Sequence, residues 1–471
     1  MNIPPINLKD SYKIDHVHQY PKGTTKVYSN LTARYAHDPD IKEYVVFGIQ
    51  YLLIEYLQRQ FNANFFAKKK QDVLRDYKRR IDGILGKDAV NIDHIAALHD
   101  LGRLPVHIKA LPEGTLCPIG VPCMTITNTH DDFFWLPNFL ETLISTTLWG
   151  MMTSATTALR FRKLLQAGAD VTSDETEMVN WQCHDFSMRG MFGVEAAAMS
   201  GAAHLLFFTG TDCIPAIDFL EEYYLADSDA ELIGGSVPAT EHSVMCMDGA
   251  AGEYDTYKRL LTDVYKTGIV SVVSDTWDYW TVIEEYLPLL KPTIIERDGK
   301  LVIRPDSGDP VQIILETIPK LWDIFGGTIN SKGYKQLDPH IGLIYGDGIN
   351  IKRAETIVLG LLNLGFSSTN VVFGVGSYTY QYVTRDTLGT AMKATYGEVN
   401  GEAREIYKDP KTDSGIKRSA KGLLKVTGDK ELIQQVSWQQ EELGMLRTVF
   451  LNGRIEKTTL KEIRERLGWI K

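Results

Sequence analysis

The chain has 471 residues, of which 44% are hydrophobic and 23% are charged. These values are typical of globular proteins with a large core, and the length favours two or three domains. The 50 Lys and Arg against 60 Asp and Glu give a net charge of −10, which argues against a general nucleic-acid coat but leaves room for a local pocket for a small anion. Five cysteines without a CxxC pair indicate neither a disulfide framework nor a thiolate zinc site.

The N-terminal part of the chain is expected to mix helices with a small sheet. Residues 43–57 place apolar side chains at helical spacing, which predicts an amphipathic helix. Residues 62–100 are rich in charged side chains and predict surface helices, whereas the β-prone runs of residues 103–127 are cut by Pro and Gly and predict a small antiparallel unit. The chain has no secretory pattern at its start and no stretch of 18 apolar residues, so we expect a cytoplasmic protein without a membrane span.

From about residue 180 the pattern changes to short apolar runs that end in polar or glycine clusters, each followed by a segment of helix length. The runs end within residues 181–185, 205–212, 235–242, 269–275, 301–306, 341–347 and 371–376. Their last residues are 27 to 41 positions apart, which fits a strand, a crossover helix and two loops. Seven such units predict a parallel α/β barrel or, failing that, an open doubly wound sheet.

Chemically capable side chains stand at the ends of these runs. They are His184, Asp212, His242, Asp275, Asp306 and Asp347. In a barrel, this rim binds the substrate. After Thr384 the pattern gives way to charged loops and a final amphipathic stretch, which we expect to belong to another layer.

The strongest local signal is residues 304–308 (RPDSG), where a strand delivers a guanidinium and a carboxylate onto a tight turn. Arginine offers a planar fork for an anion or a surface for an aromatic ring. The carboxylate of Asp306 suits ribose hydroxyls or a hydrated Mg²⁺. An Arg–Asp ion pair that only fastens the strand end is the structural alternative.

Glycine-rich turns and a histidine repeat the theme on neighbouring strands. Residues 346–348 (GDG) and 373–377 (FGVGS) let backbone N–H groups approach a phosphate, although each alone is often just a turn. His242 follows Glu241, and imidazole is both a nucleophile and a base at neutral pH. A hydrogen-bonded structural histidine is the alternative. The absence of GxSxG and HExxH argues against a serine nucleophile and a zinc site.

In their order along the chain, these segments resemble the nicotinamide phosphoribosyltransferases, a family of type II phosphoribosyltransferases. The matching segments include residues 10–13 (DSYK), 19–21 (QYP), 47–51 (FGIQY), 184–186 (HDF), 189–190 (RG), 210–212 (GTD), 241–243 (EHS), 271–275 (SVVSD), 304–308 (RPDSG), 346–348 (GDG), 384–386 (TRD) and 408–410 (KDP). The resemblance implies transfer of phosphoribosyl from phosphoribosyl pyrophosphate (PRPP) to nicotinamide in NAD salvage. It also implies Mg²⁺, facultative ATP hydrolysis through a phosphohistidine, and a homodimer with active sites at the subunit interface.

The resemblance assigns a role to each matching residue. Phe186 and Tyr12 of the partner subunit would sandwich the pyridine ring, Arg304 would lie near the ring and its amide, and Asp212 would accept a hydrogen bond from the amide NH₂. His242 would be phosphorylated and oriented by Asp275 and Glu241. The residues implied for ribose and phosphates are Arg189, Asp306, Gly346, Asp347, Gly376 and Ser377, with Arg34, Arg385 and Lys393 from the other subunit and Lys408 and Lys417 near the pyrophosphate and ATP. No metal ligand is assigned, because Mg²⁺ would be held mainly by the substrate pyrophosphate.

These matches lead to a domain plan and leave two alternatives. Residues 148–379 are predicted to form the catalytic barrel, and residues 1–147 with 380–471 a mixed α+β domain that contributes to the dimer interface and phosphate binding. Nicotinate phosphoribosyltransferase is the close rival, which the carboxylate of Asp212 disfavours because it would repel a carboxylate ligand. A nucleotide-binding sensor or signalling protein without turnover is the other. Ser377-Tyr378 replaces a glycine-rich stretch of the family, which puts one phosphate contact in doubt.

Overall fold

The computed structural model describes residues 3–407 and 420–470, and the chain divides into two compact units. The first unit comprises Met1–Ala155, Glu222–Leu225 and Val383–Gly468, and the second comprises Thr156–Glu221, Ala226–Tyr382 and Trp469–Lys471. The long helix α6 (Glu141–Thr172) contributes to both. Within the described ranges, no helix has the combination of length and apolar character that crossing a membrane requires.

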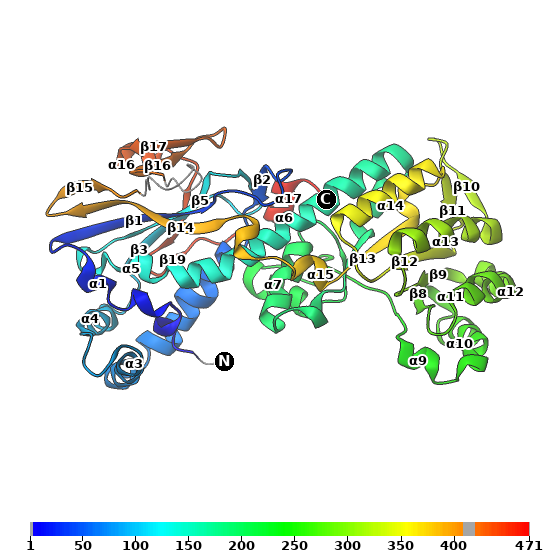
Figure 1. Ribbon diagram of the computed structural model, residues 1–471, viewed down its shortest axis with the longest axis horizontal. Helices are drawn as coiled ribbons and strands as arrows, with labels where there is room; N and C mark the ends of the chain where they lie inside the picture. The colour runs from blue at the N-terminus through cyan, green and yellow to red at the C-terminus, as the bar shows by residue number, and fades with distance from the viewer. Residues whose placement is uncertain (1–2, 408–419, 471) are drawn as a thin grey trace. The chain divides into compact units, whose positions relative to one another are not determined.

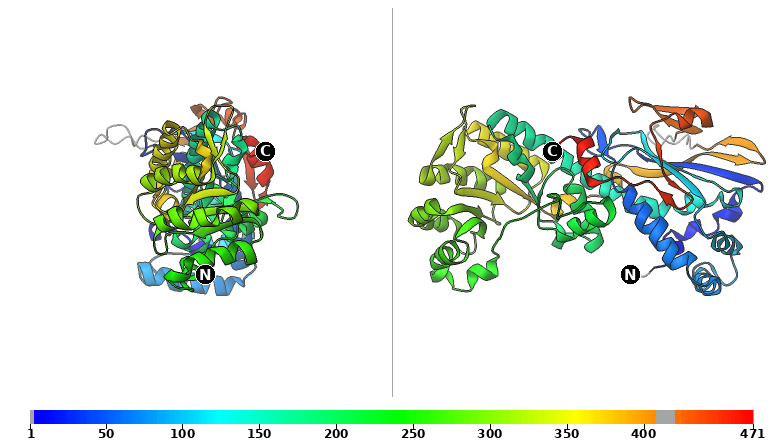
Figure 2. Two further views of the ribbon diagram at one scale, coloured as in Figure 1. Left: turned by 90° about the vertical axis from the view of Figure 1, so that its right-hand side faces the viewer. Right: turned by 180° about the vertical axis from the view of Figure 1, so that it is seen from behind.

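The first unit is built on an antiparallel sheet of seven strands. In order across the sheet they are β15 (Glu402–Glu405), β14 (Thr390–Val399), β1 (Thr24–Ala33), β5 (Pro122–Asn128), β3 (Val106–Ala110), β18 (Arg447–Leu451) and β19 (Arg454–Ile455). The ten-residue strands β1 and β14 lie side by side (Figure 2), with Ala33 opposite Thr390. One face of the sheet packs through Leu31, Ile108 and Ile126 into a core that the helices of this unit share.

Two expectations for the first unit are wrong. The helix predicted over residues 43–57 begins only at α2 (Ile49–Tyr51) and continues through η3 (Leu52–Gln60), because β2 (Glu43–Val45) pairs with β4 (Leu116–Pro118). Gly48 separates strand from helix, since its φ of +101° lies in the left-handed region that favours glycine. The charged loops expected after Thr384 include β14, whose partner β1 lies far away in the sequence.

The remaining expectations for this unit agree with the structure. The charged segment 62–100 contains the helices α3 (Lys70–Leu85) and α4 (Asp93–Leu101). The segment 103–127 contributes β3, β4 and β5, and the pairing of β3 with β5 is antiparallel. Helix α17 (Leu460–Leu467) forms the final amphipathic stretch, with Leu460 and Ile463 buried.

The second unit contains a curled parallel sheet, which confirms the predicted barrel-like fold. Its strands, in order, are β7 (Gly210–Thr211), β6 (Cys183–Asp185), β13 (Val371–Val375), β12 (Ile341–Tyr345), β9 (Asp298–Arg304) and β8 (Thr267–Val273). The segment 235–240 spans the gap between the two edge strands, because Gly235 bridges to Gly210 of β7 and Ala239 bridges to Ser271 of β8. All the strands therefore deliver their C-terminal ends to one rim.

Helices cover the outside of this sheet. Figure 1 shows α13 (Pro310–Phe325) and α14 (Ile351–Asn363) alongside the strands β12 and β13. Each begins at a side chain that accepts a hydrogen bond from its first turn, Asp309 from the N–H of Gln312 (2.9 Å) and Asn350 from that of Arg353 (3.0 Å). The apolar face of α13, which includes Ile314 and Leu321, is buried.

Candidate active site

The rim of the second unit gathers most of the predicted site residues. Asp212 follows β7, Asp275 follows β8 by two residues, and Asp306 follows β9 by two residues. Asp347 and Gly376 stand just beyond β12 and β13 in the same way. The parallel pairing of these strands accounts for the convergence of residues that are far apart in the sequence.

A cavity of about 430 Å³ runs through the inside of the curled sheet. At the rim it is lined by Phe186, Asp212 and Arg304. It continues between apolar side chains and reaches Lys300 and Asn370 near the starts of β9 and β13. Its volume suits a small organic ligand held by a few polar groups at one end.

The carboxylate of Asp212 is fixed on one side only. Its Oδ1 accepts hydrogen bonds from His184 Nε2 (2.9 Å) and Ser236 Oγ (2.6 Å). The side chain is 47% exposed, so Oδ2 is the oxygen that remains for a ligand. Burial raises the pKa of Asp212, but the hydrogen bonds from His184 and Ser236 outweigh it, and the pKa lies below its usual value. The group is therefore an oriented, ionised acceptor at the cavity mouth.

The ring of Phe186 lies against two glycines. A Cβ atom at Gly374 would lie 2.5 Å from Cδ2 of the ring, and one at Gly346 would lie 3.5 Å from Cε2. The ring centroids of His184 and Phe186 are 4.8 Å apart, with the two planes tilted. Position 374 requires glycine because the Phe186 ring lies too close to its backbone for a Cβ atom. The glycine thus allows the ring to pack directly against this backbone.

Arg304 ends β9 beside this ring site. Its Nη2 donates a hydrogen bond to the carbonyl of Thr240, and its buried Nε has no hydrogen-bond partner among the described residues. Burial lowers the pKa of Arg304, and the carboxylates of Asp306 and Asp212 partly offset this effect. An arginine remains protonated at neutral pH, so the cavity mouth holds a fixed cation with donors to spare.

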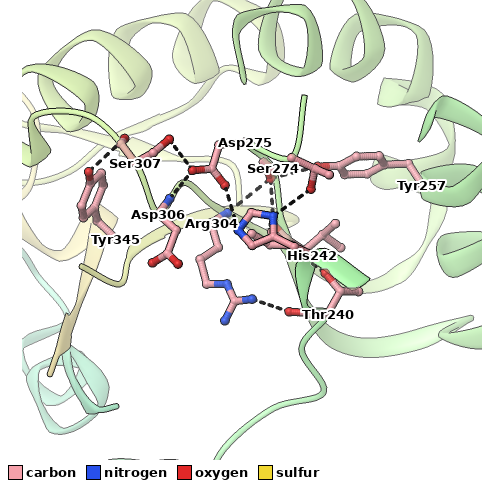
Figure 3. Close-up of polar contacts among 12 residues, drawn as sticks. Thr240, His242, Tyr257, Ser274, Asp275, Arg304, Asp306, Ser307 and Tyr345 are labelled. Atoms are coloured by element: carbon pink, nitrogen blue, oxygen red, sulfur yellow. Dashed lines mark hydrogen bonds and ion pairs between the residues drawn. The ribbon is translucent and has the colours of Figure 1, made fainter. Parts of the chain in front are cut away.

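His242 and Asp275 form a second cluster at the rim (Figure 3). His242 Nδ1 is 3.1 Å from Thr276 Oγ1, and its Nε2 is 3.8 Å from Asp275 Oδ1. The imidazole is half exposed, whereas the side chain of Asp275 is 5% exposed. Glu241, which the resemblance implies to orient His242, accepts a hydrogen bond from Ser243.

The remaining candidates for phosphate binding in the second unit surround these clusters. Asp306 and Asp347 are exposed, and Arg189 lies exposed in the short helix η7 (Met188–Gly190). Ser377, which departs from the family pattern, packs closely on this helix. A Cβ at Gly190 would lie only 2.0 Å from Ser377 Oγ. The serine thus fills space beside the backbone that carries Arg189.

Four predicted residues belong to the first unit. Tyr12, in η2 (Ser11–Lys13), is 59% exposed. Arg34 follows β1 and donates from Nε to the carbonyl of Gly389 (3.1 Å), near the start of β14. Arg385 lies in η12 (Arg385–Thr387), just before β14, and Lys393 lies exposed within that strand. Three cations therefore share one end of the β1–β14 pair. Lys408 and Lys417 lie outside the described residues.

The carboxylates at the rim bear on metal binding. In the described part of the chain, no group of three or more His, Cys, Asp or Glu side chains could hold a metal ion. Asp306 and Asp347 offer exposed oxygen ligands at the rim. Such a pair fits a Mg²⁺ ion that takes most of its ligands from a substrate and water.

Several contacting residues were not assigned a role from the sequence. Ser236 and His184 hold Asp212, Gly374 supports Phe186, and Thr276 contacts His242. The sequence places His184 at a strand end and in a segment that matches the family, but it does not indicate the contact with Asp212. Ser236 lies in a segment attached by isolated bridges, so no strand pattern marks it.

The chain is similar in sequence to known phosphoribosyltransferases. Residues 181–454 match the nicotinate phosphoribosyltransferase (NAPRTase) family, and residues 6–108 match the N-terminal domain of nicotinamide phosphoribosyltransferase. The chain is 49% identical to a nicotinamide phosphoribosyltransferase of Acinetobacter baylyi, over 99% of this chain and 97% of that protein. It is 36% identical to the enzyme of that name from Mycoplasma genitalium, over 88% and 93% of the two chains.

Solved structures are similar in fold. Human nicotinic acid phosphoribosyltransferase superposes with a TM-score of 0.58 at 14% identity, covering 98% of this chain and 93% of that one. A nicotinate-nucleotide pyrophosphorylase from Pyrococcus furiosus gives a TM-score of 0.57 at 15% identity with the same coverage. At these identities the solved structures support only the fold. The more similar sequence relatives distinguish the nicotinamide from the nicotinate phosphoribosyltransferases. The chain belongs to the nicotinamide phosphoribosyltransferase family.

Proposed function

We propose that this chain transfers the 5-phosphoribosyl group of PRPP to nicotinamide, forming nicotinamide mononucleotide and pyrophosphate in NAD salvage, and that Asp212 selects the amide. One observation carries the proposal: Asp212 presents an oriented carboxylate at the mouth of a cavity, beside the ring of Phe186. A flat heterocycle stacked on Phe186 would place its substituent within reach of that carboxylate. Aromatic stacking contributes about 0.5–1.5 kcal/mol beyond burial.

The protonation state of Asp212 favours an amide over an acid. The NH₂ group of nicotinamide can donate to Oδ2, whereas the carboxylate of nicotinate would meet a second negative charge. His184 and Ser236 keep Asp212 ionised, so it cannot become a donor to nicotinate at neutral pH. This argument disfavours the nicotinate enzyme as the alternative.

The reaction needs positioned charges rather than a protein nucleophile. The pyridine nitrogen forms a bond to C1 of the ribose while the C1–O bond breaks and pyrophosphate leaves with the electron pair. Arg189 supplies positive charge for the pyrophosphate that departs from the ribosyl cation. Arg304 supplies positive charge beside the site of the pyridine ring. Asp306 and Asp347 would hold Mg²⁺, and the bound ion would neutralise negative charge on the pyrophosphate.

The central test is direct. Purified protein is mixed with nicotinamide, PRPP and Mg²⁺, and the mononucleotide and pyrophosphate formed are quantified. We expect the two products in equal amounts. Nicotinate in place of nicotinamide should give far less product. A protein that binds PRPP without turnover would be a sensor, and one that prefers nicotinate would be the rival enzyme.

ATP coupling through His242 is the next part of the proposal. A half-exposed imidazole with one nitrogen directed toward a buried carboxylate has the arrangement of an activated histidine. We expect His242→Ala to abolish ATP hydrolysis and the ATP-dependent gain in substrate affinity while residual transfer persists. The measurement is phosphate release together with KM for PRPP, each with and without ATP. Full ATP stimulation in this variant would refute the assignment.

Dimerisation is supported by an exposed apolar patch beside η7 in the second unit. Phe192 is 90% exposed and Tyr382 is 82% exposed, and the rings of Tyr378 and Tyr382 stack at 5.7 Å. Patches of this kind mark protein interfaces. A second copy would cover the patch and bring Tyr12 of the partner subunit onto the pyridine ring.

Subunit mixing tests this arrangement. Tyr12→Ala and Phe186→Ala should each be inactive as homodimers. Mixed under exchange, half of the dimers would be heterodimers with one intact site, restoring about a quarter of the wild-type sites. A mixture that stays inactive despite confirmed exchange would contradict a shared site.

A further inference from the structure

Asp275 is a carboxylate with two different neighbours (Figure 3). Its Oδ2 accepts hydrogen bonds from the backbone N–H of Asp306 (3.0 Å) and from Ser307 Oγ (2.6 Å). Its Oδ1 faces His242 Nε2 at 3.8 Å, and this buried atom has no hydrogen-bond partner among the described residues. One rigid side chain thus touches the loop after β9 with one oxygen and faces the histidine with the other.

The loop that Asp275 holds is also anchored from its other side. The hydroxyl of Tyr345, at the end of β12, lies 3.0 Å from the carbonyl of Ser307 and 2.9 Å from that of Gly308. Asp306, the exposed carboxylate of this loop, precedes Ser307 directly. Ser307 therefore stands between two fixed points, with its side chain turned to Asp275 and its carbonyl to Tyr345.

We propose that Ser307 is a positioning residue that transmits the state of His242, through Asp275, to the loop that carries Asp306. This inference rests on the proposed phosphorylation of His242 and names how that event reaches the PRPP site. Ser307 itself is not required to contact the phosphoryl group on His242 or the phosphates of PRPP. Through its hydroxyl, a movement of the Asp275 carboxylate is coupled to a movement of the loop that carries Asp306.

The chemistry of phosphorylation supplies the driving force. With its proton on Nε2, the ring accepts from the Thr276 hydroxyl at Nδ1 and directs Nε2–H toward Asp275. When Nδ1 attacks the terminal phosphorus of ATP, an N–P bond forms, the P–O bond breaks, and ADP leaves with the electron pair. The ring then carries a positive charge, which strengthens its attraction to Asp275 Oδ1.

Closing the gap of 3.8 Å to hydrogen-bond distance requires the ring or the carboxylate to move. The side chain of Asp275 is 5% exposed, so a shift of its carboxylate is shared with the groups bonded to Oδ2 rather than with water. The Asp306 N–H and the Ser307 hydroxyl are those groups. Coupling between two sites is reciprocal, so PRPP bound at this loop should favour the phosphorylated ring to the same extent.

Ser307→Ala tests the inference. It removes the side-chain contact to Asp275 while the backbone bond from Asp306 remains. We expect transfer without ATP to stay close to the wild-type rate, and phosphate to be incorporated at His242 as before. The decrease in KM for PRPP that ATP causes in the wild type should be lost. A phosphorylated enzyme whose PRPP affinity no longer responds cannot be explained by a general loss of structure.

Matched variants make the result specific. Ser331→Ala removes a hydroxyl that donates to Asp174 at the same distance of 2.6 Å, elsewhere in the unit, and should keep the full ATP response. Ser307→Thr retains the hydroxyl and should restore part of the response. In a His242→Ala background, Ser307→Ala should have no further effect on the ATP response.

The outcomes separate the inference from the function on which it rests. If His242→Ala keeps the ATP effect, the phosphohistidine assignment fails and the inference fails with it. If His242→Ala loses the effect while Ser307→Ala keeps it in full, the proposed function stands and the inference is overturned. If Ser307→Ala no longer incorporates phosphate, the serine acts on the histidine itself, which also overturns transmission to the loop.

Discussion

Asp212 and Asp275 show how one chemical group performs two tasks at the rim of one sheet. Asp212 follows the edge strand β7 and Asp275 follows the other edge strand, β8. Each has one oxygen fixed by two hydrogen bonds. Their exposure differs, at 47% for Asp212 and 5% for Asp275. The free oxygen of Asp212 can therefore meet a ligand, whereas that of Asp275 can meet only a neighbouring side chain.

The segment between the two edges supplies partners to both carboxylates. Ser236 donates to Asp212, and His242, six residues later, faces Asp275. This segment is attached to the edge strands by isolated bridges. A small movement of it would therefore change the contacts of both Asp212 and Asp275. The difference between the two ends is thus one of burial rather than of chemistry.

The largest expected effect is at the exposed carboxylate. Asp212→Asn removes the negative charge and turns an acceptor into a mixed donor and acceptor. We expect the ratio of kcat/KM for nicotinamide over nicotinate to fall by about 10- to 100-fold, as a lost or mismatched buried polar contact costs about 1–3 kcal/mol. Asp218→Asn on the exposed face of α8 (Ile214–Tyr224) is the control. An unchanged ratio would remove Asp212 from substrate selection.

The next largest effect is expected at a different buried carboxylate of the second unit, that of Glu253. Glu253, at the start of α10 (Glu253–Arg259), is 2% exposed, and burial, aided by the nearby Asp278, raises its pKa to about 7. The unfolded chain releases this proton near the ordinary value of 4.5, so stability is lost as the pH rises from there toward 7. We expect Glu253→Gln to stabilise the protein by about 1–3 kcal/mol at alkaline pH and to have little effect at acidic pH.

Urea unfolding at pH values below and above this window measures the difference. Glu285→Gln, which changes an exposed carboxylate nearby, should leave the midpoint unchanged at both. Equal midpoints for wild type and Glu253→Gln at alkaline pH would show that Glu253 ionises freely in the folded state.

The smallest effect tests how Asp212 is oriented. Ser236→Ala removes one of two donors to Oδ1, and a hydrogen bond to a charged group is worth about 1.5–3 kcal/mol before relaxation and solvent reduce it. We expect KM for nicotinamide to rise about threefold to tenfold. Because the pKa of Asp212 is held down by this bond, the loss of binding on acidification should begin at a higher pH in the variant.

A matched serine gives the control for that experiment. Ser243→Ala also removes a hydroxyl that donates to an exposed carboxylate, that of Glu241, and should leave the acid limb of nicotinamide binding where it is. If both variants shift the limb equally, or neither does, Ser236 does not set the protonation of Asp212.

The sequence predicted the parallel unit better than the antiparallel one. Each strand of a βα repeat is read from a local run and its polar end, so Asp212, Asp275 and Asp306 were placed at the rim correctly. Strand β14 was missed because its partner β1 is distant in the sequence. Pairing of that kind leaves no local signal.

The site was predictable to the level of residues at strand ends and no further. Nothing in the sequence states that Ser236 and His184 converge on one oxygen of Asp212, or that Ser307 turns its hydroxyl to Asp275. These contacts depend on rotamers and on loops between elements. Gly374 lies in a turn that the sequence predicts to approach a phosphate, whereas its contact is with the ring of Phe186.

A crystal structure with bound nicotinamide tests the central claim most directly. The account predicts the pyridine ring stacked on Phe186, with the amide nitrogen within hydrogen-bond distance of Asp212 Oδ2 while Oδ1 keeps its bonds to His184 and Ser236. A ring bound elsewhere, or an amide turned so that its carbonyl oxygen faces Asp212, would contradict it.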